Sequence, residues 1–169
     1  MASHHHGAVP ADQIGCAVLT VSDTRTEADD ESGRLIRTLL EGGGHRVPFY
    51  AIVPDDPVAI RTAVTEIVER RDVRALVVTG GTGIAPRDVT IESIGSLWAR
   101  ELPGFGETFR ALSFAEIGPP ALLSRATAGV IATTFVAVLP GSRAACRLAM
   151  ERLILPVLGH AVALIGPER

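Results

Sequence analysis

The sequence predicts an α/β fold with three layers, α/β/α, in which helices cover both faces of a mostly parallel central sheet. Short apolar runs rich in β-branched residues alternate along the chain with longer segments of helical periodicity. Such runs are typical of strands that are buried on both faces. Two of them end in glycine-containing turns, at 80–83 and 140–142. Strands that alternate with helices favour parallel pairing through crossover connections.

Length and composition indicate a single globular domain. The chain has 169 residues, of which 47% are hydrophobic and 21% are charged, and these are ordinary values for a soluble protein. We assign the domain to residues 11–169. Residues 1–10, with His4-His5-His6, are interpreted as a flexible leader or the remnant of a tag, and these histidines are not taken as ligands.

Charge and hydropathy exclude several classes of partner. The net charge of −3, without a dense arginine cluster, argues against a nucleic-acid-binding surface. No apolar run approaches the length of a membrane span and no signal-peptide pattern is present, so we expect no membrane contact and a cytoplasmic location. Cys16 and Cys146 lie in apolar surroundings and are interpreted as core residues.

The first half of the chain predicts strands at 14–21, 46–53 and 74–78 and a helix at 31–41. The strand at 46–53 begins with polar residues, which favours a position nearer a sheet edge. Another helix begins at Pro57, which fits the first helical position, with Asp56 as its N-cap. Capping therefore accounts for Asp56 and leaves Asp55 without a structural role.

The second half predicts a helix from Thr90 to about residue 100 and another that begins in the turn 101–107. After the break at Pro119-Pro120 come a short helix near 121–125 and strands at 129–132 and 135–139. The chain then predicts a helix from Arg143 to about residue 158 and a last extended segment at 161–165.

The strand at 74–78 runs into the loop Thr79-Gly80-Gly81-Thr82-Gly83, around which the chain is organised. Glycines can adopt positive φ, which lets backbone N–H groups converge on an anion. The loop is neither a Walker A motif, because the chain has no lysine, nor a dinucleotide fingerprint, because no third glycine follows. A tight turn is one interpretation. Arg87 and Asp88 at its mouth favour the other, a phosphate site.

The remaining candidates for chemistry are carboxylates at the ends of predicted strands. Asp88, Asp55 and Asp23 are so placed, and for Asp23 the preferred interpretation is capping or surface solvation. The absence of lysine and of a Gly-x-Ser-x-Gly elbow disfavours covalent catalysis. Glycine loops, Asp and Arg suit phosphate-on-phosphate transfer, which asks for positioning, Mg²⁺ and charge neutralisation.

Several motifs, agreeing in order over nearly the whole chain after the leader, resemble the MoaB/Mog family of molybdenum cofactor biosynthesis. The stretches 19–33 and 113–118 resemble its B-type branch more closely. The motifs are Thr79-Gly80-Gly81-Thr82-Gly83, Pro86-Arg87-Asp88-Val89-Thr90, Pro103-Gly104-Phe105-Gly106-Glu107, Leu123-Ser124-Arg125, Ala128-Gly129-Val130 and Leu139-Pro140-Gly141-Ser142.

The resemblance implies a molybdopterin-binding fold, usually a homotrimer, and a Mg²⁺-dependent adenylyltransferase that joins AMP from ATP to molybdopterin and releases pyrophosphate. It also implies contact with the molybdate-insertion enzyme. The implied catalytic and Mg²⁺-binding residues are Asp55 and Asp88. The implied ATP and pterin contacts are Thr79, Gly80, Gly81, Thr82, Gly83, Arg87, Glu107, Ser124, Pro140, Gly141 and Ser142.

One departure from the family pattern keeps other functions open. Val138 stands where the adenylyltransferases commonly carry Asn. Together with the B-type stretches, it motivates an alternative, a pterin-binding module or assembly partner without catalysis. A third hypothesis is an unrelated nucleotide-binding regulator, which would bind ATP and not molybdopterin.

Overall fold

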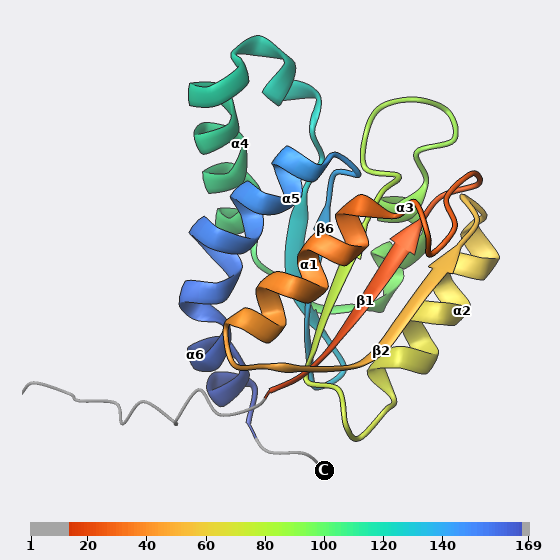
Figure 1. Cartoon of the computed structure of the whole chain (residues 1–169), viewed down its shortest axis with the longest axis vertical. Helices are drawn as coiled ribbons and strands as arrows, with labels where there is room; N and C mark the ends of the chain where they lie inside the picture. The colour runs from red at the N-terminus through yellow and green to blue at the C-terminus, as the bar shows by residue number, and fades with distance from the viewer. Residues whose placement is uncertain (1–13, 167–169) are drawn as a thin grey trace, which may run out of the picture.

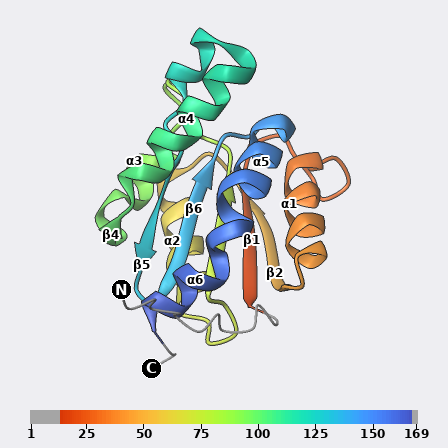
Figure 2. The same ribbon diagram turned by 90° about the vertical axis from the view of Figure 1, so that its left-hand side faces the viewer.

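The computed structural model describes residues 14–166, so the leader predicted at 1–10 lies outside the described residues. A six-stranded sheet in the order β2-β1-β3-β6-β5-β4 forms the middle layer, with helices on both faces (Figure 1 and Figure 2). The predicted three-layer α/β fold is therefore confirmed. The strands are β1 Gly15–Val21, β2 Arg46–Val53, β3 Ala75–Thr79, β4 Trp98–Glu101, β5 Thr127–Ile131 and β6 Thr134–Leu139.

Four neighbouring strands, β2, β1, β3 and β6, run parallel, whereas β5 is antiparallel to both of its neighbours. The polar start of β2 correctly indicated an edge strand. The register sets Thr20 opposite Thr79, and Thr79 opposite Leu139. The carboxyl ends of β1, β3 and β6 therefore meet at one edge of the sheet, where open α/β sheets bind their ligands.

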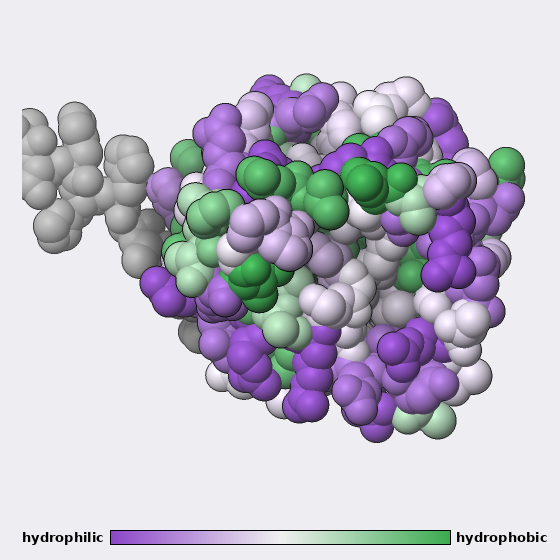
Figure 3. Space-filling view, turned by 90° about the horizontal axis from the view of Figure 1, so that it is seen from above, coloured by the Kyte–Doolittle hydropathy of each residue, from purple (hydrophilic) through white to green (hydrophobic). Residues whose placement is uncertain are grey.

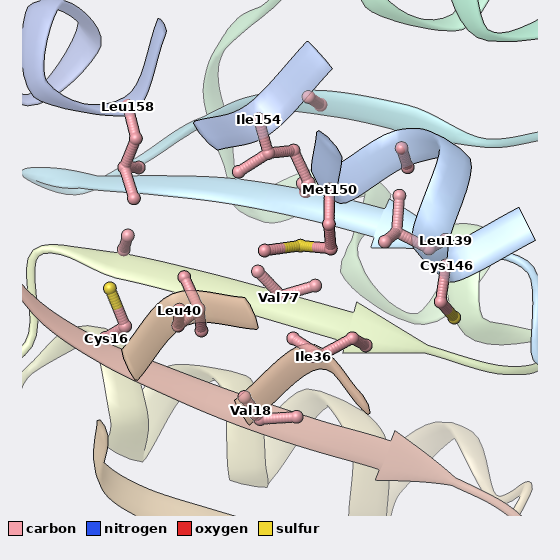
Figure 4. Packing of buried hydrophobic residues seen from close by; sticks show 14 of the residues in the cluster. Cys16, Val18, Ile36, Leu40, Val77, Leu139, Cys146, Met150, Ile154 and Leu158 are labelled. Carbon is pink, nitrogen blue, oxygen red and sulfur yellow. The ribbon is translucent and has the colours of Figure 1, made fainter. Parts of the chain in front are cut away.

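Two hydrophobic clusters hold the layers together. Ile36 of α1 and Met150 and Ile154 of the C-terminal helix pack on Val18 and Val77 of the sheet (Figure 4). On the other face α2 and α3 pack on β1, β3 and β6. The helices are α1 Glu31–Gly42, α2 Pro57–Val68, α3 Thr90–Ile94, α4 Pro103–Ile117, α5 Arg143–Ala149 and α6 Leu155–Ile165, with 3₁₀ turns η1 Gly95–Leu97 and η2 Pro119–Leu123 and the π turn η3 Met150–Ile154.

Capping defines the starts of the two helices in the first half. The carboxylate of Asp30 accepts the N–H of Gly33 at 2.9 Å, and that of Asp56 accepts the N–H of Ala59 at 2.8 Å. The predicted N-cap role of Asp56 is confirmed. Asp30 is 2% exposed, and its cap lies at the same sheet edge as the loops.

The helix predicted from Thr90 to about residue 100 is wrong in its second half. α3 ends at Ile94, and the chain passes through η1 into β4. Trp98 and Glu101 pair with Ile131 and Gly129 of β5, so partners distant in sequence override the local helical pattern. Likewise the short helix expected at 121–125 is the 3₁₀ turn η2, which ends at Leu123.

The extended segment predicted at 161–165 is also wrong, because α6 continues to Ile165. Pro156 lacks an N–H and its ring crowds the preceding turn, and the helix widens into η3 just before it instead of ending. The whole stretch Arg143–Ile165 is long and apolar enough to cross a membrane by length and composition. Its residues Cys146, Met150 and Leu158 are fully buried against the sheet, so one side of the stretch packs into the core, whereas Val157 and Leu164 on it are exposed.

Candidate functional site

A cavity of about 460 Å³ opens where β1, β3 and β6 end. This volume lies within the usual range for small-molecule sites. The loops after these strands, the start of α1 and one side of α4 line it, and Figure 3 looks down on this edge, where apolar and charged side chains surround a hollow. The lining includes Thr79, Gly80, Gly81, Thr82, Gly83, Arg87, Asp88, Asp55, Ser124, Pro140, Gly141 and Ser142.

The glycine loop after β3 has a backbone that other residues cannot adopt without strain. Gly80 and Gly81 have φ of 106° and 64°. A Cβ on Gly80 would lie 2.2 Å from the Val21 carbonyl oxygen, and one on Gly81 would lie 2.2 Å from Thr90 Oγ1. Thr90 Oγ1 in turn donates to the carbonyl of Gly80 at 2.9 Å. These positions therefore require glycine, and the loop is held by a side chain from α3.

Asp55 and Asp88 flank this loop. A Cβ on Gly81 would lie 3.2 Å from Asp55 Oδ1, and one on Gly83 would lie 2.6 Å from Asp88 Oδ2. Asp88 Oδ2 also accepts the N–H of Ala85 at 2.8 Å, which fixes the direction of the carboxylate. Both predicted carboxylates thus lie beside the predicted phosphate loop.

Burial and neighbouring charge act on Asp55. Desolvation raises the pKa of the Asp55 carboxyl, and the negative charges of Asp23 and Asp88 raise it further, while a hydrogen bond from the Asp23 backbone and the charge of Arg87 oppose them. The N–H of Asp55 also donates to Asp23 Oδ1 at 3.0 Å. Asp23 therefore has a structural role, as its preferred interpretation expected, and it also makes the site more anionic.

The two carboxylates fit a divalent cation that is shared with a ligand. Among residues 14–166, no group of three or more His, Cys, Asp and Glu side chains could hold a metal by itself. Mg²⁺ is commonly held by only one or two carboxylates together with substrate phosphates. Asp55, crowded by Asp23 and Asp88, is the kind of anionic group that a cation relieves. The residues present therefore fit Mg²⁺ that is held together with a phosphate-bearing ligand.

The second loop, Pro140–Ser142, lies against the first. Thr79 Oγ1 donates to the carbonyl of Pro140 at 3.0 Å, and Ser32 Oγ of α1 donates to the carbonyl of Gly141 at 2.8 Å. Ser142 Oγ accepts the N–H of Ala145 at 3.3 Å and so caps α5. The cavity therefore has polar groups on two adjacent loops, which suits a ligand or ligand pair with phosphate at more than one place.

Sequence reasoning missed some lining residues. Asp30 accepts hydrogen bonds from Thr20 Oγ1 at 2.6 Å and from the Tyr50 hydroxyl at 2.7 Å. Burial and the Asp30 carboxylate raise the pKa of Tyr50. The position of Asp30 before the apolar periodicity of α1 signals its cap role. Arg25, from the segment before α1, also lines the cavity, and no motif marks it.

Glu107 of α4 lies apart from most of the predicted set. It lines a separate cavity of about 450 Å³ with Trp98 and Arg110. Ser124 lines both this cavity and the main one, and is the predicted candidate that shares a cavity with Glu107. Val138 is fully buried among the apolar residues on the α2 and α3 face, so its departure from the family pattern changes the core and not the cavity lining.

The chain is similar to known proteins along its length. It matches the family described as "Probable molybdopterin binding domain" over residues 17–160. It is 47% identical over 170 residues to the Molybdenum cofactor biosynthesis protein B of Bacillus subtilis (strain 168), which covers 100% of both chains.

Solved structures show the same likeness. A crystal structure of Molybdenum cofactor biosynthesis protein B has a TM-score of 0.89 at 47% identity and covers 92% of this chain and 97% of that chain. The Molybdopterin biosynthesis Mog protein from Mycobacterium ulcerans has a TM-score of 0.81 at 28% identity and covers 91% and 98%. The chain is thus more similar to that B-type protein than to this Mog protein, in the direction that 19–33 and 113–118 indicated.

Proposed function

This chain belongs to the MoaB/Mog family, which acts in molybdenum cofactor biosynthesis, and from that premise we propose that it adenylylates molybdopterin with ATP in a Mg²⁺-dependent reaction. The single observation that carries the proposal is the shared cavity. The glycine loop, two carboxylates and the Pro140–Ser142 loop all face one hollow of about 460 Å³. A nucleotide and a second phosphate-bearing substrate would meet there.

The division of the cavity follows from its chemistry. The N–H groups of the glycine loop would bind the ATP phosphates, with the guanidinium groups of Arg87 and Arg25 at the same opening. Ser124 and the loop Pro140–Ser142 would bind the molybdopterin side. The exposed apolar side chain of Ile117 in α4 lines part of the cavity wall and suits a flat ring system.

The reaction is a displacement at phosphorus. A phosphate oxygen of molybdopterin attacks the α-phosphorus of ATP, the new P–O bond forms, and the bond to the β-phosphate oxygen breaks and releases pyrophosphate. The attacking phosphate is already ionised near neutral pH, so the site needs no strong general base. The described residues that line the cavity include neither histidine nor lysine, which agrees with this requirement.

Asp55 and Asp88 would hold Mg²⁺, which when bound neutralises charge on the phosphate oxygens. Asp88 is fixed by its hydrogen bond from Ala85, and Asp55 is made more receptive to a cation by its neighbours. Arg87 balances part of this negative charge when no cation is bound.

The test is an assay of the purified protein with ATP and molybdopterin, with and without Mg²⁺, that follows adenylyl-molybdopterin and pyrophosphate together. We expect both products in equal amounts with Mg²⁺ and neither with a chelator. Absence of product from folded protein in Mg²⁺ would refute the proposal. Calorimetry then separates the alternatives: pterin binding without ATP binding indicates a non-catalytic module, and ATP binding without pterin binding indicates a nucleotide-binding regulator.

We also propose that the protein works as a cytoplasmic homotrimer that contacts the molybdate-insertion enzyme. Exposed apolar side chains outside the main cavity support association: Phe114 of α4, Leu122 of η2 and Leu164 of α6 are 48–70% exposed. Light scattering should give three times the mass of the chain at micromolar concentration. A monomer under those conditions would contradict the trimer.

A further inference from the structure

The side chain of Arg125, which follows η2, contacts the loop that carries Asp88. Its Nε donates to the carbonyl of Gly83 at 2.8 Å, and its Nη2 donates to the carbonyl of Asp88 at 2.7 Å. Its main-chain N–H also donates to the carbonyl of Thr82 at 3.2 Å. One residue therefore contacts both ends of the segment between the last glycine and Asp88.

That segment has little other support. Residues 84–87 are exposed, Ile84 is 68% exposed, and no helix or strand forms between β3 and α3. Within it, the N–H of Asp88 donates to the carbonyl of Ala85 at 2.9 Å, and the N–H of Ala85 donates back to the Asp88 carboxylate. These bonds shape the turn locally, whereas Arg125 attaches the turn to the rest of the domain.

Glu92 of α3 holds the guanidinium in place. Its carboxylate accepts from Nη1 of Arg125 and also from Nη2, the latter at 3.4 Å. The pairing with Arg125 lowers the pKa of the Glu92 carboxyl. A planar guanidinium can bond two carbonyls and a carboxylate at once in a fixed fork, which an ammonium group cannot do.

We propose that Arg125 is a positioning residue that holds the Thr82–Asp88 loop in its nucleotide-binding shape through the carbonyls of Gly83 and Asp88, with Glu92 as its counter-ion. It does not line the main cavity and acts through the loop. The consequence for catalysis rests on the proposed function. The consequence for the shape of the loop does not, because these contacts exist without nucleotide.

Preorganisation explains why such a tie matters. If the loop is already in its binding shape, ATP does not have to order it, and less of the binding energy is lost. Without Arg125 the amides and Asp88 would sample several arrangements. The KM for ATP should then rise more than kcat falls, since the chemistry is unchanged in those molecules that reach the correct arrangement.

The first measurement is hydrogen exchange of the amides at 80–90 in the protein without nucleotide. We compare the wild type with Arg125→Ala and with Arg147→Ala, a matched control whose guanidinium pairs with Glu151 at 2.7 Å away from the site. We expect exchange at 80–90 to rise about tenfold or more in Arg125→Ala, as for loss of charge-assisted hydrogen bonds, and to stay unchanged in Arg147→Ala. Added guanidinium should slow it again.

The second measurement is the ATP dependence of AMP transfer. In Arg125→Ala the KM for ATP should rise about tenfold or more, and guanidinium should partly restore it. Arg125→Lys keeps the positive charge but loses the forked guanidinium, so its KM for ATP should lie between those of the wild type and Arg125→Ala. If Arg125→Ala does not fold, Arg125→Lys replaces it in both measurements. If the wild type shows no AMP transfer, the proposed function is overturned. The role of Arg125 in holding the loop is then tested by hydrogen exchange alone. Exchange in Arg125→Ala, or in Arg125→Lys if that is the folded variant, equal to that in Arg147→Ala overturns the inference.

Discussion

Two loops that follow neighbouring strands of the same sheet are built in different ways. The loop after β3 needs positive φ at Gly80 and Gly81 and leads to the short helix α3. The loop Pro140–Ser142 after β6 has no residue with positive φ, and its last residue caps the C-terminal helix. Both line the cavity and both are held by side chains from other elements, but only the first depends on glycine at positive φ.

The difference indicates how the site divides its work. The first loop has a shape that its own sequence does not stabilise, and Thr90 and Arg125 hold it from outside. The second loop has no positive φ and is held by the Ser142 cap together with Thr79 and Ser32. We therefore expect substitutions in the first loop to reduce both stability and function, and substitutions in the second loop to reduce mainly stability, by smaller amounts.

The largest expected effect is on activity, from Asp88→Asn. Asparagine keeps the acceptor for the Ala85 N–H and removes the charge, so AMP transfer should fall by about 10²-fold or more while the fold is retained. Asp72→Asn is the matched control, since Asp72 pairs with Arg70 outside the cavity and its loss should leave kcat unchanged. Full activity in a folded Asp88→Asn protein would remove Asp88 from the mechanism.

The next effect separates the two loops directly. Gly81→Ala places a Cβ at positive φ and 2.2 Å from Thr90 Oγ1, so it should lower the free energy of unfolding by about 1–3 kcal/mol. Gly141→Ala meets only an ordinary contact, 3.5 Å from Gly80 Cα, and should change that free energy by less than about 1 kcal/mol. Urea unfolding of both variants measures this. Equal losses would mean that the loops do not differ as described.

A smaller effect belongs to the second loop. Ser142→Ala removes the side-chain acceptor at the start of α5 and should cost about 1 kcal/mol of stability, as for other N-caps. The KM for ATP should change little. Urea unfolding and steady-state kinetics on the same protein check both statements, and a large rise in the KM for ATP at unchanged stability would place Ser142 on the nucleotide side.

The smallest effect has the opposite sign. Because the pKa of Asp55 is raised in the folded state, its ionised form opposes folding above that pKa. Asp55→Asn should therefore raise Tm slightly at pH 7, by about 1–3 °C. The gain should shrink as pH falls through the raised pKa and vanish below about 3.9, the ordinary value for Asp. A Tm that drops at pH 7 would contradict this.

Much of the fold was predictable because its signals are local. The strands β1, β2 and β3 are recognisable in the sequence as apolar runs, and Asp56 with Pro57 marks the start of α2. β4 was not predictable in this way, since it forms only through pairing with β5, about thirty residues further on. The predicted helix already passed Pro156 and ended near residue 158, whereas in the structure α6 continues to Ile165, so the miss concerns only where the helix ends.

The site was predictable where one short segment carries it. The glycines at 80–83, followed by Asp88, predicted the phosphate loop and the first carboxylate beside it. The lack of a capping role for Asp55 predicted the second carboxylate. Arg125 lies 42 residues along the chain from Gly83 and 37 from Asp88, so only the fold shows that its guanidinium bonds their carbonyls. Glu107 entered through the resemblance, and the fold places it in another cavity.

The most direct test of the account is a crystal structure of the protein with Mg²⁺ and a non-hydrolysable ATP analogue. We predict the triphosphate against the N–H groups of residues 80–83, with Mg²⁺ about 2.1 Å from carboxylate oxygens of Asp55 or Asp88. A nucleotide bound elsewhere, for example in the cavity beside Glu107, with Asp55 and Asp88 free of metal, would contradict it.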